Sequence, residues 1–177
     1  FISKNINSCI INAGDGTHEH PSQALLDAYS LIEKLGDLNG KKIAIVGDVL
    51  HSRVALSNIF ILRALGADIK LCAPKSLLPK YIESLGVKVS DDLIQTLKWC
   101  DAVNMLRIQN ERTDINFFPS TREYSRLYGL DKVKFEKIKK DILILHPGPI
   151  NRGVEITSDI ADSKYAIILD QVENGVA

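Results

Sequence analysis

The sequence has no excess of charge of either sign and no long apolar run. Its 177 residues include 22 lysines and arginines and 22 aspartates and glutamates, so no net field draws the chain toward nucleic acid or a membrane surface. No apolar run approaches the roughly 20 residues needed to span a bilayer. We therefore expect neither a nucleic-acid nor a membrane partner, and any phosphate or carboxylate must be bound by individual arginines.

Cysteine is also scarce. The three cysteines, Cys9, Cys72 and Cys100, are widely spaced, and at least two of them lie in apolar, strand-like runs. This usage is typical of reduced packing residues in a cytoplasmic protein and fits no zinc motif. The segment His18-Glu19-His20 is too short for a helical two-histidine metal site, which needs four-residue spacing. We expect a cytoplasmic location, no metal and no other cofactor.

What the sequence does contain is a regular alternation of apolar runs and amphipathic segments. Strand-like runs occupy residues 41–48, 69–73, 87–89, 102–106 and 142–145. Helical patterns cover residues 21–35, 53–65, 77–85, a stretch from about 91, and 132–140. This alternation predicts an α/β fold, a doubly wound, Rossmann-like parallel sheet with helices on both faces. Residues 109–128 are polar and irregular, 166–169 form one more apolar run, and 1–177 are expected to form one domain.

In such folds ligands bind beyond the carboxyl ends of the strands. Four polar or glycine-rich loops follow strand-like runs or precede helices in this way, at residues 15–23, 48–53, 107–112 and 146–153. We expect the four loops to converge at one edge of the sheet.

The first of these loops leads into a helix. Pro21 suits a first helical position, which places His20 at the helix N-terminus, where free backbone N–H groups favour anions. Gln23 lies one turn on and faces the same way. An imidazole, an amide and a helix N-terminus together suit a ligand with a carbonyl and a phosphate. The alternative is a capped helix that carries a surface histidine.

Two of these loops contain an arginine suited to an anion. Arg53 stands at a helix start, where the dipole disfavours a cation, so an anion is expected beside it; the alternative is an exposed arginine that points away. Arg107 has a planar fork suited to a carboxylate, and Gln109 points the same way. Glu111 and Arg112 are expected to pair with each other or their neighbours. Gly47 alone does not make the three-glycine loop of a dinucleotide site.

The loop at 146–153 contains two prolines around a glycine. Prolines remove N–H donors and leave carbonyl oxygens to accept from a ligand, for which an NH₂ group is suitable. His146 is expected to be structural, and Glu155 is expected to pair with Arg53 or Arg152. No serine or cysteine has the local context of a covalent nucleophile.

In order and spacing, four segments resemble the aspartate carbamoyltransferase family: residues 12–23, Gly47-Asp48 with His51-Ser52-Arg53, 106–112 and 146–155. The resemblance runs from about residue 11 to 175. It implies the aspartate-binding half of a two-domain enzyme of pyrimidine biosynthesis with a homotrimer as its basic unit. That enzyme converts carbamoyl phosphate and L-aspartate to N-carbamoyl-L-aspartate and phosphate.

The resemblance also implies residue roles. His20, as the catalytic residue, would hydrogen-bond the carbonyl oxygen of carbamoyl phosphate. Gln23 and the carbonyls of Pro147, Gly148 and Pro149 would hold its NH₂ group. The aspartate carboxylates would be bound by Arg53 and Arg107 with support from Gln109, while Glu111, Arg112 and Glu155 would support the loops.

Departures from the family pattern define the alternatives. The ornithine-specific family carries a cysteine in the loop that here reads His-Pro-Gly-Pro, and a Ser-Met-Gly signature that does not occur here. The family's carbamoyl-phosphate-binding domain is absent from these 177 residues, so we expect the isolated chain to be nearly inactive and to expose an apolar patch where that domain docks. A second hypothesis is a free-standing, non-catalytic dicarboxylate-binding or interaction module of the same fold.

Overall fold

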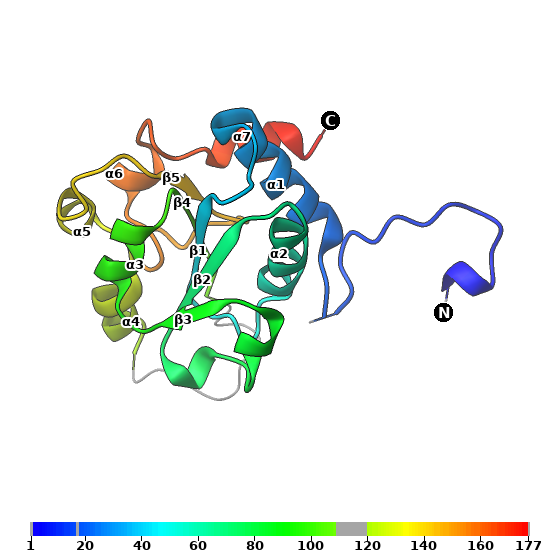
Figure 1. Ribbon diagram of the computed structural model, residues 1–177, viewed down its shortest axis with the longest axis horizontal. Helices are drawn as coiled ribbons and strands as arrows, with labels where there is room; N and C mark the ends of the chain where they lie inside the picture. The colour runs from blue at the N-terminus through cyan, green and yellow to red at the C-terminus, as the bar shows by residue number, and fades with distance from the viewer. Residues whose placement is uncertain (1, 17, 109–119, 177) are drawn as a thin grey trace.

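The computed structural model describes residues 2–16, 18–108 and 120–176, and its centre is a five-stranded parallel sheet (Figure 1). The strands are ordered β3 (Lys88–Ser90), β2 (Asp68–Cys72), β1 (Lys42–Val46), β4 (Ala102–Met105) and β5 (Leu143–Leu145). The chain therefore adds β2 and β3 on one side of β1 and then crosses to add β4 and β5 on the other. This reversal between β1 and β4 is the topological switch point of a doubly wound sheet, as the sequence predicted.

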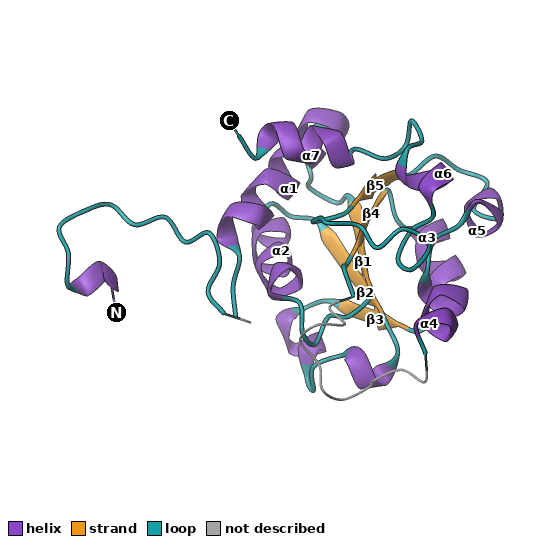
Figure 2. Cartoon of the chain, turned by 180° about the vertical axis from the view of Figure 1, so that it is seen from behind, coloured by secondary structure: helices purple, strands orange, loops and turns teal. Residues whose placement is uncertain are grey.

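Helices cover both faces of the sheet (Figure 2). One layer contains α1 (Pro21–Leu35), α2 (Arg53–Ala64) and α7 (Ile168–Asn174). Within the described residues, the other layer contains four short helices: α3 (Leu93–Trp99), α4 (Thr121–Tyr128), α5 (Lys132–Glu136) and α6 (Ser158–Ala161). The central strands β1 and β4 are thus buried on both sides, which explains why they are largely apolar runs without polar alternation, whereas the outer strands β2 and β3 contain polar residues.

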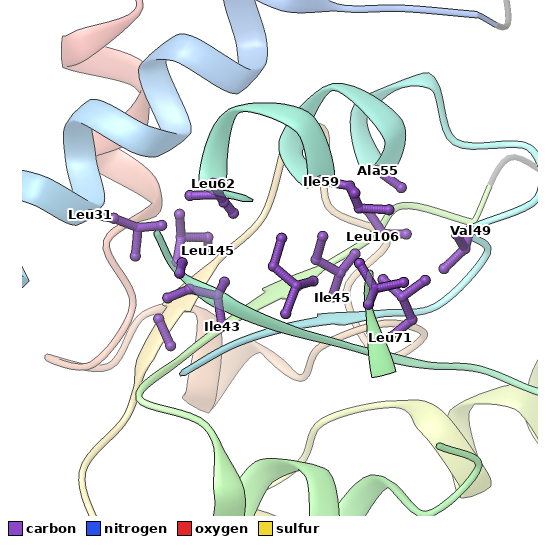
Figure 3. Close-up of a cluster of buried hydrophobic side chains, with 14 of the residues drawn as sticks. Leu31, Ile43, Ile45, Val49, Ala55, Ile59, Leu62, Leu71, Leu106 and Leu145 are labelled. Atoms are coloured by element: carbon purple, nitrogen blue, oxygen red, sulfur yellow. The ribbon is translucent and has the colours of Figure 1, made fainter. Parts of the chain in front are cut away.

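The larger core cluster lies between the sheet and the layer of α1 and α2 (Figure 3). Leu31 of α1 and Ile59 and Leu62 of α2 pack against Ile43 and Ile45 of β1, and all five are at most 2% exposed. Each such side chain contributes on the order of 1.5–3 kcal/mol on burial. This packing holds the first turns of both helices, which carry site residues, against the sheet.

The prediction of one helix over residues 77–85 is wrong. Two short 3-10 helices, η2 (Lys75–Leu77) and η3 (Ile82–Leu85), stand there instead. Pro79 restricts Leu78 to an extended conformation, and Tyr81 has a left-handed φ of 64°. Both features interrupt an α-helix. The residue before a proline avoids helical angles, and a left-handed residue cannot continue a right-handed helix.

One further expectation needs correction. The segment expected to be irregular contains α4, which Ser120 caps by accepting from the Glu123 N–H at 3.1 Å and which buries Tyr124 and Tyr128 one turn apart. The apolar run at 166–169 leads into α7 and contributes only a single bridge to the sheet. The polar composition of α4 hid a helix whose stability comes from these two buried rings.

The N-terminal segment runs from the 3-10 helix η1 (Ile2–Lys4) away from the body of the molecule before it turns back to α1 (Figure 1). Its apolar side chains are exposed, Ile11 by 85%. No helix in the described parts of the chain is long and apolar enough to cross a membrane.

Glu155 is a buried carboxylate that ties the end of β4 to the loop after β5. Its Oε1 accepts from the Ile108 N–H at 2.7 Å and from Asn151 Nδ2 at 2.7 Å, and its Oε2 accepts from the Asn151 N–H at 2.9 Å. The loop-supporting role expected of Glu155 is consistent with these contacts. They also fix the positions of two segments that border the candidate site.

The pairing expected for Glu155 is nevertheless wrong. Arg152 binds Asp162 through two hydrogen bonds of 2.7 and 2.8 Å, and Arg53 donates to the Gly16 carbonyl at 3.3 Å. Burial opposes ionisation of Glu155, but the nearby His146 ring, whose Nε2 lies 3.9 Å from Oε2, and the hydrogen bonds from the Ile108 N–H and Asn151 outweigh it and leave the pKa below its usual value. Neutral donors, the Ile108 N–H and the Asn151 N–H and NH₂ groups, therefore stabilise this carboxylate in place of an arginine.

We expect Glu155→Gln to lower the free energy of unfolding by about 1–3 kcal/mol at neutral pH, because the new NH₂ group would face N–H donors. Since the folded pKa of Glu155 is depressed, the stability from its charge is present above the unfolded pKa and lost as pH falls through the folded one. Urea unfolding at neutral and acidic pH measures both effects, and the difference between parent and variant should shrink in acid. Glu136→Gln, at an exposed site in α5, is the control. A difference that does not change with pH would contradict the assignment.

Candidate active site

A pocket of about 210 Å³ lies beyond the carboxyl ends of β1 and β4, at the switch point of the sheet. The topology thus brings together residues from loops that are far apart in sequence. Seven of the residues singled out from the sequence line it together with Ser52 and Val54; the seven are His20, Gln23, Arg53, Arg107, Pro147, Gly148 and Pro149. Gln109, Glu111 and Arg112 lie outside the described residues.

His20 is the N-cap residue of α1, as the position of Pro21 predicted. Its Nδ1 accepts from the Gln23 N–H at 3.4 Å and lies 3.3 Å from the Ser22 hydroxyl. With Nδ1 as acceptor, the neutral ring carries its proton on Nε2. The capping and ligand-binding interpretations are therefore compatible, because one nitrogen serves the helix and the other remains for a ligand.

The surroundings of His20 also favour the neutral ring over the charged one. Partial burial, and then the positive charge of Arg53, hold the pKa of His20 below its usual value of 6.5. The ring is therefore mainly neutral near pH 7, and a proton on Nε2 is available for donation to a ligand without a charge on the ring. Its backbone is also held, because the His20 N–H donates to Ser57 Oγ at 2.9 Å and the Ser57 hydroxyl donates to Glu19.

Arg53 is the first residue of α2, and Ser52 caps the helix by accepting from the Ala55 N–H at 3.2 Å. The Arg53 guanidinium is half-buried and lines the pocket, so the alternative of an exposed side chain that points away is wrong. It packs over Gly14, where a Cβ would lie 2.6 Å from Nη1. Gly14 therefore leaves the room that this guanidinium occupies.

Arg107 is the second half-buried arginine of the pocket and follows β4 by two residues. Two guanidinium groups in one pocket of an otherwise neutral chain create a local positive site. Such forks bind carboxylates and phosphates with paired hydrogen bonds. The pocket is therefore suited to a ligand with more than one anionic group.

The backbone of the loop from His146 to Pro149 presents acceptors and no spare N–H donors. Pro147 and Pro149 have no N–H, and the Gly148 N–H donates to His146 Nδ1 at 2.9 Å. The His146 N–H is also used, by Gln171 Oε1 at 2.9 Å, and His146 is only 2% exposed. These contacts are consistent with the structural role expected of His146, and the loop backbone can only accept from a ligand.

Sequence reasoning missed Asp27, a carboxylate of α1 that is 1% exposed. It accepts from four side-chain amides, one of which is Gln23 Nε2 at 2.8 Å. The available signal was its position: Asp27 lies four residues after Gln23 and three after the buried Ala24, which places a charge on the apolar side of a predicted helix.

Comparisons with known proteins agree with this architecture. The family model described as aspartate/ornithine carbamoyltransferase, Asp/Orn binding domain, matches residues 39–177. The aspartate carbamoyltransferase catalytic subunit of Flavobacterium psychrophilum is 67% identical over 177 residues, which are 100% of this chain and 58% of that protein. The chain thus spans less than two thirds of the length of this curated relative.

Solved structures show the same relationship. The catalytic subunit of M. jannaschii aspartate transcarbamoylase is 33% identical with a TM-score of 0.79, over 98% of this chain and 57% of that one. The aspartate transcarbamoylase of Trypanosoma cruzi in complex with carbamoyl phosphate is 26% identical with a TM-score of 0.83, over 98% and 57% of the two chains. The resemblance inferred from the motifs is confirmed: the chain belongs to the aspartate/ornithine carbamoyltransferase family and contains its Asp/Orn binding domain.

Proposed function

We propose that this chain is the aspartate-binding half of an aspartate carbamoyltransferase, which transfers the carbamoyl group of carbamoyl phosphate to the amine of L-aspartate in pyrimidine biosynthesis. The observation that carries the proposal is the single pocket in which two arginines, a neutral histidine and an acceptor-only loop meet. These groups match two carboxylates, a carbonyl oxygen and an NH₂ group, respectively.

The carbamoyl group is assigned to His20, Gln23 and the loop of residues 147–149. His20 Nε2–H donates to the carbonyl oxygen, since Nδ1 is used by the helix. The NH₂ group donates to the side-chain oxygen of Gln23 and to carbonyl oxygens of the loop. A donor and several acceptors in this arrangement distinguish the two ends of a carbamoyl group.

L-aspartate is assigned to the two arginines. Arg53 and Arg107 bind its carboxylates, with Gln109 in support, and this choice favours a diacid over an acceptor with a cationic side chain such as ornithine. Glu111 and Arg112 are proposed to support the loop, and Glu155 holds the segments beside it.

The reaction then needs no covalent enzyme intermediate. The amine nitrogen of aspartate attacks the carbonyl carbon to form a C–N bond, and negative charge develops on the carbonyl oxygen, where His20 stabilises it. The bond from carbon to the phosphate oxygen breaks, and the departing phosphate takes the amine proton. Alignment of both substrates in one pocket supplies much of the acceleration.

The remaining partner is a carbamoyl-phosphate-binding domain. The relative described above is longer than this chain, which covers 58% of it. Helices α1 and α7 pack together, border a groove of about 480 Å³ and expose large apolar side chains, including Leu25 by 60% and Leu169 by 82%. Such surfaces are suited to a docked domain.

We propose that the complete enzyme is a cytoplasmic homotrimer, in a compartment where thiols such as Cys72 remain reduced.

We expect the bisubstrate analogue N-(phosphonacetyl)-L-aspartate to bind tightly, in isothermal titration calorimetry, only to this chain combined with a carbamoyl-phosphate-binding domain. Carbamoyl aspartate should likewise form only when this chain and the carbamoyl-phosphate-binding domain are both present. Arg107→Ala should weaken binding at least tenfold, about 1.4 kcal/mol or more, because an arginine–carboxylate pair is lost. Arg126→Ala, at an exposed site on α4, should have no effect.

If neither sample binds the analogue and Arg107→Ala behaves as the parent does, the catalytic proposal fails. Weak dicarboxylate binding by the isolated chain, with no gain from the second domain, would instead favour a free-standing binding module. Carbamoyl transfer to ornithine in preference to aspartate would favour the other branch of the family.

We expect His20→Asn in the assembled enzyme to reduce kcat by about 10²–10³-fold, the typical effect of losing one donor to a developing oxyanion. Asparagine is a good N-cap, so the thermal unfolding midpoint should change little. Steady-state kinetics and thermal unfolding of the same preparation separate the two roles. A variant with unchanged kcat would show that His20 serves only to cap α1.

A further inference from the structure

The side chain of Asp27 lies where four elements meet, behind the pocket. Its Oδ1 accepts from Gln23 Nε2 at 2.8 Å and from Gln171 Nε2 at 2.7 Å. Its Oδ2 accepts from Asn58 Nδ2 at 2.7 Å and from Asn104 Nδ2 at 3.1 Å. The four amides belong to α1, α7, α2 and β4, in that order.

A carboxylate fixes the orientation of such amides. An ionised carboxylate only accepts, whereas an amide has a donor end and an acceptor end that are almost equal in shape. Each of the four amides must therefore turn its NH₂ group toward Asp27. Burial holds the pKa of Asp27 above its usual value, and the hydrogen bonds from Asn58, Gln171, Gln23 and Asn104 offset part of that rise.

At Gln23 this constraint determines what the pocket offers a ligand. Gln23 lines the pocket, and because its NH₂ group is bound to Asp27, its side-chain oxygen is left to face the ligand. A glutamine without this partner could present either end. With Asp27 in place, Gln23 is an acceptor.

The same constraint orients Gln171, which supports the 147–149 loop on another side of the pocket. Its NH₂ group is bound to Asp27, so its oxygen accepts the His146 N–H at 2.9 Å. His146 Nδ1 in turn accepts the Gly148 N–H at 2.9 Å. The acceptor-only loop of residues 147–149 is thereby held from the same carboxylate oxygen, Oδ1.

We propose that Asp27 is a positioning residue that makes the pocket selective for an NH₂ donor by orienting Gln23 directly and the 147–149 loop through Gln171 and His146. The inference rests on the proposed function, because the NH₂ group is that of carbamoyl phosphate. Asp27 itself does not line the pocket.

The other oxygen of Asp27 provides a matched control. Asn58 and Asn104 bind Oδ2 and do not line the pocket, and in the described structure their own side-chain oxygens have no hydrogen-bond partner. A substitution of Asn58 or Asn104 removes a hydrogen bond from the same buried network but leaves the bonds of Gln23 and Gln171 to Oδ1 in place. Asp27→Leu and Asn58→Leu both replace a fully buried polar side chain by an apolar one of similar size.

The test measures kcat and KM for carbamoyl phosphate in the enzyme assembled from this chain and its carbamoyl-phosphate-binding domain, below the unfolding temperature of every variant. We expect Asp27→Leu to raise KM about tenfold and Asn58→Leu to change it less than twofold, although both lower the unfolding temperature. Asp27→Asn should restore KM to within about threefold, because Asn58 and Asn104 can each turn over to accept from the new NH₂ group while Gln23 and Gln171 keep their acceptor.

A purely structural role predicts that KM changes in neither leucine variant, and that result would overturn the inference while the proposed function stands. A parent enzyme with no carbamoyl transfer would overturn the proposed function and this inference with it. If Asp27→Leu does not fold, Gln171→Leu replaces it: a rise in KM relative to Asn58→Leu supports the inference, and equal values overturn it.

Discussion

The buried carboxylate of Asp27 is the interaction on which the site depends. A charge that is 1% exposed is costly unless hydrogen bonds replace its lost hydration, and four amides from α1, α2, β4 and α7 supply them. The same bonds hold these four elements at one point behind the pocket. Stability and binding geometry are thus coupled, because two of the groups that satisfy the buried charge, Gln23 and Gln171, also line or support the site.

The second constraint is topological. The chain reverses direction across the sheet between β1 and β4, and the arginines that follow these two strands, Arg53 and Arg107, therefore meet in one pocket. A neutral chain with 22 residues of each charge can in this way create a strong local site for anions without a global field. The neutral His20 between the helix terminus and Arg53 adds a donor without adding charge.

The sequence alone determined the features that depend on local pattern. Alternating apolar runs and helical segments predicted the parallel sheet with helices on both faces, because strands covered on two sides must be apolar throughout. Strand ends followed by polar residues predicted which loops would meet, and seven of the proposed site residues line one pocket. Pro21 and the prolines around Gly148 fix the backbone φ angle and lack an N–H donor in any fold, so their effects could be predicted from the sequence.

Only the tertiary structure decided the features that depend on distant partners. Asp27 and Gln171 are 144 residues apart, and nothing local shows that one binds the other or that Glu155 binds the Ile108 backbone and not an arginine. The helix expected at 77–85 failed because Pro79 and the left-handed Tyr81 outweigh its apolar pattern. The physical reason is the same throughout: periodicity and turn chemistry are encoded nearby, whereas the partner of a buried charge is set by which elements the folded sheet brings together.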